Sequence, residues 1–119
     1  MWKSLYIAGA TGSEGGIVFS DEEYKKSCRI TLEKCQNYYA ITCGVYGAMV
    51  HTTFADFDHY QSLYDEMKME LQKFIDTDTN EDEELEFYDY FCNKFWFIIP
   101  RAGKLITFLL FYYISSGVS

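Results

Sequence analysis

A single apolar stripe between Asp58 and Asp76 limits the fold of this chain more than any other feature. Its members recur at spacings of three and four residues: Tyr60, Leu63, Tyr64, Met67, Leu71, Phe74 and Ile75. Charged and amide side chains fall between them, so the pattern predicts one long amphipathic helix. Such a helix has to bury its stripe against a second layer, and a β-sheet is the surface that we expect.

Short runs with the composition of β-strands precede this helix, at residues 5–8, 17–19, 28–34, 38–43 and 48–54. Between Cys28 and Lys34 apolar and polar residues alternate, and this period of two favours a strand over the helical spacing that also fits the segment. A second amphipathic helix is predicted from Asp82 to Trp96. The sequence therefore predicts an α+β fold, in which an antiparallel sheet of four or five strands packs against two helices.

Two local patterns refine this prediction. Ser20 and Glu23 have the spacing of a capping box, which predicts a helical turn over Asp21–Lys26. Gly44 and Gly47 punctuate the last two strands, and we expect them to lie opposite each other. The predicted core face then carries Tyr39, Ile41, Cys43, Ala48, Val50 and Phe54. The other face is half polar and carries Tyr38, Thr42, Met49, His51 and Thr53.

Length and composition predict one domain and a tail. The chain has 119 residues, 49% of them hydrophobic, which is enough for one core. We expect an α+β domain over residues 1–99 and a hydrophobic tail or final strand over residues 100–119. As a helix, the apolar run Leu105–Ile114 would reach ~15 Å, about half of a bilayer core, which argues against a membrane span. Membrane association through the tail and an altered reading frame at the C-terminus are the alternatives.

The N-terminal residues and the cysteines predict a cytoplasmic protein. Met1–Ala10 lacks the charged start and long apolar run of a secretory signal. The four cysteines, Cys28, Cys35, Cys43 and Cys92, are then expected to be reduced and to serve as small core or strand residues.

Negative charge is concentrated in one segment. The formal net charge is −8, and the segment Asp76–Asp89 contains eight acids with no lysine or arginine. Such a chain repels nucleic acid and favours a basic protein as its partner. We expect Glu83, Glu84 and Glu86 to contact that partner; a solvated connection between two helices is the alternative explanation.

The segment Gly9–Gly15 resembles the glycine pattern of short-chain dehydrogenases, in which backbone N–H groups approach a pyrophosphate. An apolar run typical of a strand follows it here, where that family has a helix. The chain is also too short for several βα units. We therefore expect a turn between two strands, and no cofactor.

The sequence contains two partial patterns of metal ligands. Asp76, Asp78 and Asn80 resemble the first half of an EF-hand calcium loop, but Glu81 and Phe87 replace its glycine and its bidentate glutamate. The cysteines and histidines lack the close spacing of a zinc site. We expect no metal, with the three calcium-like residues as the weak candidate. A Cys43–His51 nucleophile pair is excluded in the predicted register, because the two side chains point to opposite faces.

The polar face of the sheet is a second candidate binding surface. Arg29, Glu33, Tyr38 and His51 are its candidate residues, because arginine and tyrosine are enriched at interfaces. The runs Cys28–Glu33 and Tyr39–Thr52 within this region are similar to a group of uncharacterised small bacterial proteins. That resemblance covers about a fifth of the chain and implies a bacterial origin, with no activity attached to it.

These observations lead to one expectation of function and two alternatives. We expect a non-enzymatic, protein-binding module of the immunity or inhibitor type, which covers a basic site on its partner. The first alternative is a small ligand-binding protein or enzyme that uses the polar sheet face around His51. The second is a protein that associates with membranes through its C-terminal tail.

Overall fold

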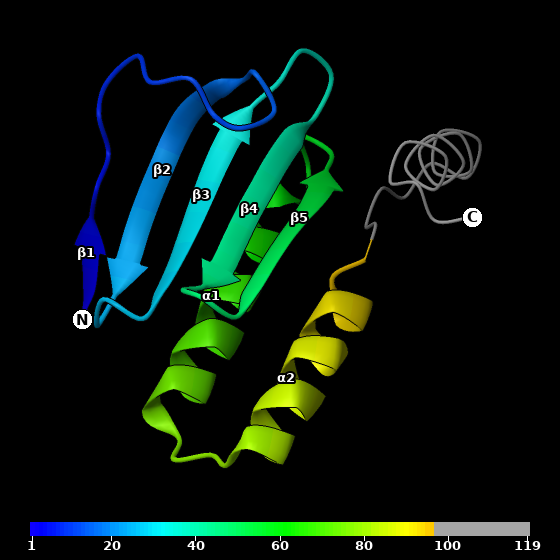
Figure 1. The fold of residues 1–119 in the computed structure, drawn as a ribbon. Coiled ribbons are helices and arrows are strands. Elements are labelled where there is room, and N and C mark those ends of the chain that lie inside the picture. Colours follow the sequence, from blue (N-terminus) through cyan, green and yellow to red (C-terminus); the bar gives the residue numbers. More distant parts are fainter. Residues whose placement is uncertain (97–119) are drawn as a thin grey trace.

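The computed structural model describes residues 1–96, which form one sheet and two helices (Figure 1). The strands are β1 (Trp2–Ser4), β2 (Ile17–Tyr24), β3 (Cys28–Lys34), β4 (Tyr39–Val45) and β5 (Met49–Ala55). The helices are α1 (Tyr60–Asp76) and α2 (Glu81–Lys94). All strand pairs are antiparallel, and the strands lie in the order β1-β2-β3-β4-β5. The predicted α+β fold is confirmed.

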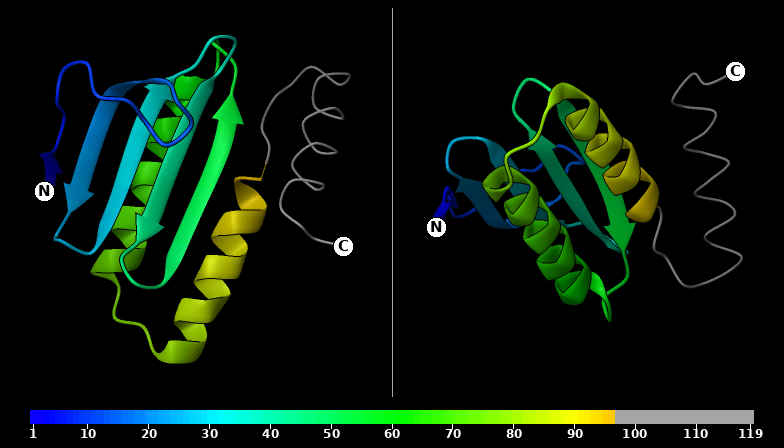
Figure 2. Two further views of the ribbon diagram at one scale, coloured as in Figure 1. Left: turned by 45° about the horizontal axis from the view of Figure 1, so that its top comes forward. Right: turned by 90° about the horizontal axis from the view of Figure 1, so that it is seen from below.

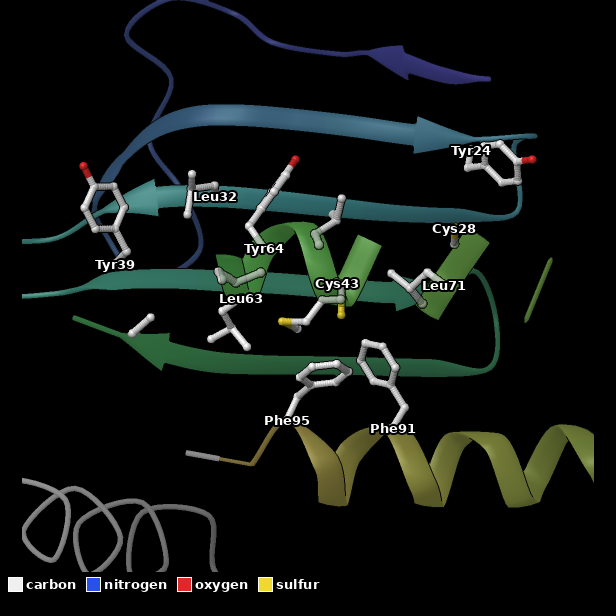
Figure 3. Close-up of a cluster of buried hydrophobic side chains, with 14 of the residues drawn as sticks. Tyr24, Cys28, Leu32, Tyr39, Cys43, Leu63, Tyr64, Leu71, Phe91 and Phe95 are labelled. Atoms are coloured by element: carbon white, nitrogen blue, oxygen red, sulfur yellow. The ribbon is translucent and has the colours of Figure 1, made fainter. Parts of the chain in front are cut away.

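The two helices and the sheet share one core. Helix α1 buries Leu63, Tyr64, Met67 and Leu71 of the predicted stripe. Helix α2 lies beside β5 and adds Phe91 and Phe95 to the same cluster (Figure 3). The sheet contributes Cys28, Ile30, Leu32, Tyr39, Ile41, Cys43 and Met49. We call the face that carries these residues the inner face.

The opposite, outer face is crossed by the N-terminal segment, residues 5–16. Figures 1 and 2 show this segment passing over β3 on the side away from α1. The predicted strand at residues 5–8 is not formed, and the first strand is instead Trp2–Ser4, which pairs with the end of β2. The segment is tied to the sheet by the backbone bonds Leu5 N–H to Asp21 O and Val18 N–H to Ala10 O.

The predicted register of the last two strands is wrong by three residues, because Gly44 lies opposite Val50 and not opposite Gly47. Val45 pairs with Met49, so Cys43 lies opposite His51 and Ile41 opposite Thr53. The turn closes with a bond from Ala48 N–H to Val45 O, and Gly47 occupies its left-handed position with φ +77. Gly47 thus serves the turn and does not face Gly44. Because side chains alternate along a strand, this shift moves every residue of β5 to the other face.

As a result, the side chains of β5 are exchanged between the faces. Met49, His51 and Thr53 are buried on the inner face, where the sequence placed Ala48, Val50 and Phe54. Val50 is 79% exposed on the outer face. Tyr39, Ile41 and Cys43 lie in the core as predicted.

The predicted helical turn at Asp21–Lys26 is wrong as well, because β2 continues to Tyr24. A bulge between Val18 and Ser20 changes which residues face the helices. Ser20 then reaches the Tyr64 hydroxyl at 2.9 Å, and Glu22 accepts bonds from Tyr64 and Lys68. These contacts across the layers stabilise the strand against the local capping-box pattern.

Residues 97–119 lie outside the described part of the chain, and with them the predictions for residues 100–119. Within residues 1–96, neither helix combines the length and the apolar character needed to cross a membrane.

Two lysines in the β2–β3 turn generate a test of backbone strain. Lys25 and Lys26 both have left-handed φ angles, 50° and 55°, in a turn closed by Ser27 N–H to Tyr24 O. That conformation costs a residue with a Cβ atom about 1 kcal/mol or more, whereas glycine adopts it freely. We expect Lys26→Gly to raise the free energy of unfolding by about 0.5–1 kcal/mol, measured by urea denaturation.

The matched control is Gly47→Ala. A Cβ atom at Gly47 would meet no atom within 4 Å, so only its φ of +77 opposes the substitution. We expect Gly47→Ala to lower the stability by about 1 kcal/mol. A loss of stability in Lys26→Gly would show that the lysine turn is not strained.

Candidate functional site

The outer face is organised around a buried carboxylate. Glu33 of β3 is 1% exposed and lies beneath the glycine-rich part of the N-terminal segment. Its oxygens accept bonds from Gly16 N–H at 2.8 Å and from Glu14 N–H at 3.2 Å. A carboxylate is buried at tolerable cost only when such donors replace its water. Glu33 therefore fixes the segment to the sheet.

Glycine is required at position 12 for this arrangement. A Cβ atom at Gly12 would lie 2.4 Å from the Glu33 carboxyl carbon, so any larger residue would displace the carboxylate from its N–H donors. The segment that resembles a phosphate-binding loop thus directs its backbone N–H groups at an anion that belongs to the chain itself. The structure shows no dinucleotide-type βα unit among residues 1–96, where a β-strand and not a helix follows the glycines.

Arg29, another predicted site residue, lies on the outer face and forms an ion pair with Asp21. Its Nε and Nη2 atoms donate to the two oxygens of Asp21 at 2.8 and 2.6 Å. Thr31 also donates to Asp21, at 3.1 Å. Asp21 is buried, and its bonds raise the pKa of the Arg29 guanidinium, which stays charged. This two-pronged pair fixes the direction of the arginine side chain.

A row of hydroxyl groups continues across the outer face. Thr31, Thr42 and Thr52 are register neighbours on β3, β4 and β5. The Thr42 and Thr52 hydroxyls are 3.1 Å apart, and Ser13 of the N-terminal segment lies 3.3 Å from Thr42. The hydroxyl row therefore joins the segment to the middle of the sheet.

A cavity of 720 Å³ lies between the N-terminal segment and the β4–β5 turn. Its polar lining comes from Ser13, Asp21, Arg29, Thr31 and Thr42. Its apolar lining includes Leu5, Ile7, Ala10, Val18, Val45, Ala48 and Val50. Arg29 and Thr42 were predicted for this face, whereas the wall formed by residues 5–13 was not.

Tyr38 lies beside the end of β4 and belongs to a small second cluster with Phe54, Ala40 and Cys35. Its ring packs edge-on against Phe54 at 5.3 Å. Burial raises the pKa of Tyr38 to about 12, so its hydroxyl stays protonated. The cluster lies at the opposite end of β4 from Gly44, and Tyr38 does not line the cavity.

His51 lies on the inner face, and the structure does not bring it together with Arg29. Its Nε2–H donates to the backbone carbonyl of Phe95 at 2.9 Å, and Thr53 donates to the carbonyl of Trp96 at 3.4 Å. These bonds attach the two residues that follow α2 to the inner face of the sheet. Burial lowers the pKa of His51, which keeps it neutral.

The register brings Cys43 opposite His51, which the predicted pairing excluded. Burial raises the pKa of the Cys43 thiol far above its usual range, and the pKa of Cys28 to about 11. Because the thiolate is the nucleophile, neither thiol is activated. The His51 ring bonds the carbonyl of Phe95 and, among residues 1–96, has no hydrogen bond to Cys43. The four cysteines are free, and the two most buried belong to the core.

The calcium-like residues have other partners. Asp76 accepts bonds from Tyr24 at 2.8 Å and from Lys25 at 2.6 Å. Asn80 is the N-cap of α2, and its side chain accepts from Glu83 N–H. Residues 1–96 contain no cluster of three or more histidine, cysteine or acidic side chains that is suited to a metal ion. Asp78 is exposed between these two residues.

Of the three acids predicted to bind a partner, only Glu86 points freely outward. Glu83 closes the capping box by accepting from the backbone N–H of Asn80 at 3.1 Å, and Glu84 is partly buried. With about 100° per residue, Asp82, Glu86 and Asp89 lie in one exposed line at spacings of four and three. We call these three residues the acidic stripe of α2.

Comparisons with protein-family models, with curated proteins and with solved structures gave no match to this chain.

The role of Glu33 generates a test of the N-terminal segment. Glu33→Gln keeps the size of the side chain but loses its charge, and places an NH₂ group near the N–H donors of Glu14 and Gly16. We expect the free energy of unfolding to fall by about 2–3 kcal/mol in urea denaturation.

Glu14→Gln is the control, because the backbone of Glu14 makes the contact and its exposed side chain forms no ion pair within residues 1–96. We expect Glu14→Gln to change stability by less than about 0.5 kcal/mol. Equal effects of the two substitutions would contradict the role assigned to the Glu33 carboxylate.

The burial of His51 generates a pH prediction. Its folded pKa lies below the ordinary value of 6.5, so the unfolded chain binds this proton more readily. Stability contributed by neutral His51 is therefore complete above about pH 6.5 and is lost as the pH falls below that value. We expect chemical denaturation between about pH 5 and 7 to show this loss of stability in the wild type. The loss should be smaller in His51→Gln.

His59, the other histidine, provides the control. It is exposed at the start of α1 and bonds Asp56 at 2.7 Å. His59→Gln should retain the loss of stability that His51 causes. The assignment fails if His51→Gln has the same pH dependence as the wild type.

Proposed function

We propose that this chain is a non-enzymatic binding module that recognises a basic protein through the acidic stripe of α2. The observation that carries the proposal is the distribution of ion pairs. The pairs among residues 1–96 involve Asp21, Glu22, Asp56, Glu66, Glu70 and Asp76, and no acid between Asp78 and Asp89. The cations of the fold neutralise acids elsewhere, and the start of α2 retains its charge.

The helix dipole accounts for part of this charge. Acids in the first turn of a helix are stabilised by its N-terminus, and Glu81, Asp82, Glu83 and Glu84 occupy that turn. Glu86 and Asp89 lie beyond it, where the dipole gives little stabilisation. Their exposure therefore favours a function outside the helix itself.

Exposed apolar groups accompany the stripe. Leu85 is 60% exposed and lies next to Glu86 and Asp89 on the helix surface, and Tyr90 is 48% exposed on the other side. A mixture of acids with an apolar and an aromatic side chain suits a protein surface better than a small cation. The end of α2 that carries them projects past the sheet together with the α1–α2 connection (Figure 1).

An acidic stripe of this kind steers a basic partner and fixes its orientation. The proposal therefore includes the immunity or inhibitor class, in which the module covers a basic site on its partner. It excludes nucleic acid, because the stripe repels phosphate, and it assigns no cofactor and no catalytic residue. A bacterial, cytoplasmic setting is part of the proposal, supported by the resemblance of Cys28–Thr52 and by the free thiols.

Charge reversal at Glu86 and Asp89 tests the proposal. Both residues lie outside the Asn80–Glu83 capping box, so E86K/D89K leaves the start of the helix intact. Tagged wild-type and variant proteins are used to capture partners from a lysate of the source organism at low and high salt. We expect the wild type to retain one basic protein stoichiometrically at low salt, and E86K/D89K to lose at least about 90% of it.

The matched control is D58K/D65K, which changes the net charge by the same amount at two exposed acids that form no ion pair with any residue the structure describes. We expect this variant to retain the partner. Equal loss in both variants would assign binding to net charge alone. Full retention by E86K/D89K would overturn the role of the stripe.

A further inference from the structure

The floor of the outer-face cavity is hollow because a glycine occupies the middle of one row of the sheet. Arg29, Gly44 and Val50 are register neighbours on β3, β4 and β5, so the middle of this row carries no side chain. A Cβ atom at Gly44 would lie 2.5 Å from the carbonyl oxygen of Met49. Glycine is therefore the residue that this approach of β4 to β5 admits, and the gap above it stays unfilled.

The wall of the cavity is held before any ligand arrives. Residues 5–13 form this wall, and the Glu33 carboxylate holds the same segment through Glu14 and Gly16. The contact between Ser13 and Thr42 at 3.3 Å ties the wall to the floor. Ligand sites of small molecules are commonly pre-formed in this way and enclose about 300–1,000 Å³, and the volume here is 720 Å³.

The charges of the cavity cancel. Asp21 and Arg29 are the charged residues among those described that line it, and they form one ion pair. An anion or a cation would have to compete with that pair, whereas an uncharged ligand leaves it intact. Arginine has five N–H groups. Arg29 donates two of them to Asp21, so its remaining donors suit a carbonyl oxygen.

From this geometry we infer that the outer face contains a binding site for an uncharged small molecule with a flat apolar body and a carbonyl acceptor. The apolar body lies over Gly44 between Ile7 and Val50, and the carbonyl accepts from the outer N–H groups of Arg29. The site is separate from the acidic stripe, none of whose residues line the cavity.

The probe that tests this site is 6-propionyl-2-(dimethylamino)naphthalene, a neutral fluorophore with a ketone. Titrated into the full chain, it is expected to saturate at one molecule per chain with a blue-shifted emission. The anionic probe 1-anilinonaphthalene-8-sulfonate has a similar ring system, and we expect it to bind at least about tenfold more weakly. Equal affinity for the two probes would overturn the inference of an uncharged ligand.

Two substitutions locate the probe. Ala48 lines the cavity and is exposed in the β4–β5 turn, so Ala48→Trp fills the space without entering the core. We expect it to weaken binding at least about tenfold. Ser62→Trp places the same ring on an exposed position of α1 and should leave the affinity unchanged.

A third substitution tests the donor. Arg29→Lys keeps the charge beside Asp21 but removes the forked donors, and should weaken the ketone probe several-fold. The inference is overturned if the wild type shows no saturable signal, or if Ala48→Trp binds as the wild type does. Neither result affects the capture of a basic protein that E86K/D89K tests, so the cavity and the acidic stripe are tested independently.

Discussion

The bonds between the Glu33 carboxylate and the backbone of the N-terminal segment determine the shape of the outer face. A meander of four strands with two helices already buries the inner face, and it does not need residues 5–16 for its core. The segment stays on the sheet because the carboxylate, once buried, has to keep its N–H donors. The path of the segment, the glycine at position 12 and the wall of the cavity all follow from that requirement.

The two faces of the sheet therefore differ in kind. The inner face is a close-packed apolar layer, and two of its polar groups, His51 and Thr53, donate to the carbonyl groups of the residues that follow α2. The outer face is polar and hollowed, and it is lined by an ion pair, a row of hydroxyl groups and a pinned segment. The acids from Asp78 to Asp89 take part in none of the ion pairs among residues 1–96, and this run of acids on and before α2 supports the binding by surface contact that we propose.

The sequence predicted those parts of the fold that depend on periodic patterns within one segment. The stripe from Tyr60 to Ile75 required a helix, and the alternation at Cys28–Lys34 required a strand, because burial of one face leaves few alternatives. Patterns of two glycines or of a capping box were less reliable. Gly47 lies in the β4–β5 turn and does not pair with Gly44. Ser20 bonds the Tyr64 hydroxyl of α1 and does not cap a helix. Both errors arose from contacts that a local pattern does not contain.

The candidate site was predicted only in part for the same reason. Arg29 followed from the alternation at Cys28–Lys34, but its partner Asp21 was assigned to a helical turn and so was missed. His51 was predicted on the wrong face because the register of β5 differs from the predicted one by three residues, an odd number. Glu33 was predicted as a binding residue, whereas in the structure it is buried and bonds backbone N–H groups of the N-terminal segment, which no side-chain pattern marks. The spacing of glycines at positions 9, 12, 15 and 16 was the available signal, and it indicated an anion without indicating which one.

The order of the strands has a consequence for how the molecule opens and closes. Strands β2 to β5 are joined by tight turns to their neighbours, so their contacts are short-range in sequence and form with little loss of chain entropy. The N-terminal segment closes a longer loop and is held by a few polar bonds. In amide hydrogen exchange we expect it to open as a separate cooperative unit, at lower free energy than the meander. The wall of the cavity would then be the last part of the molecule to assemble and the first to detach, while the helices and their charge remain in place.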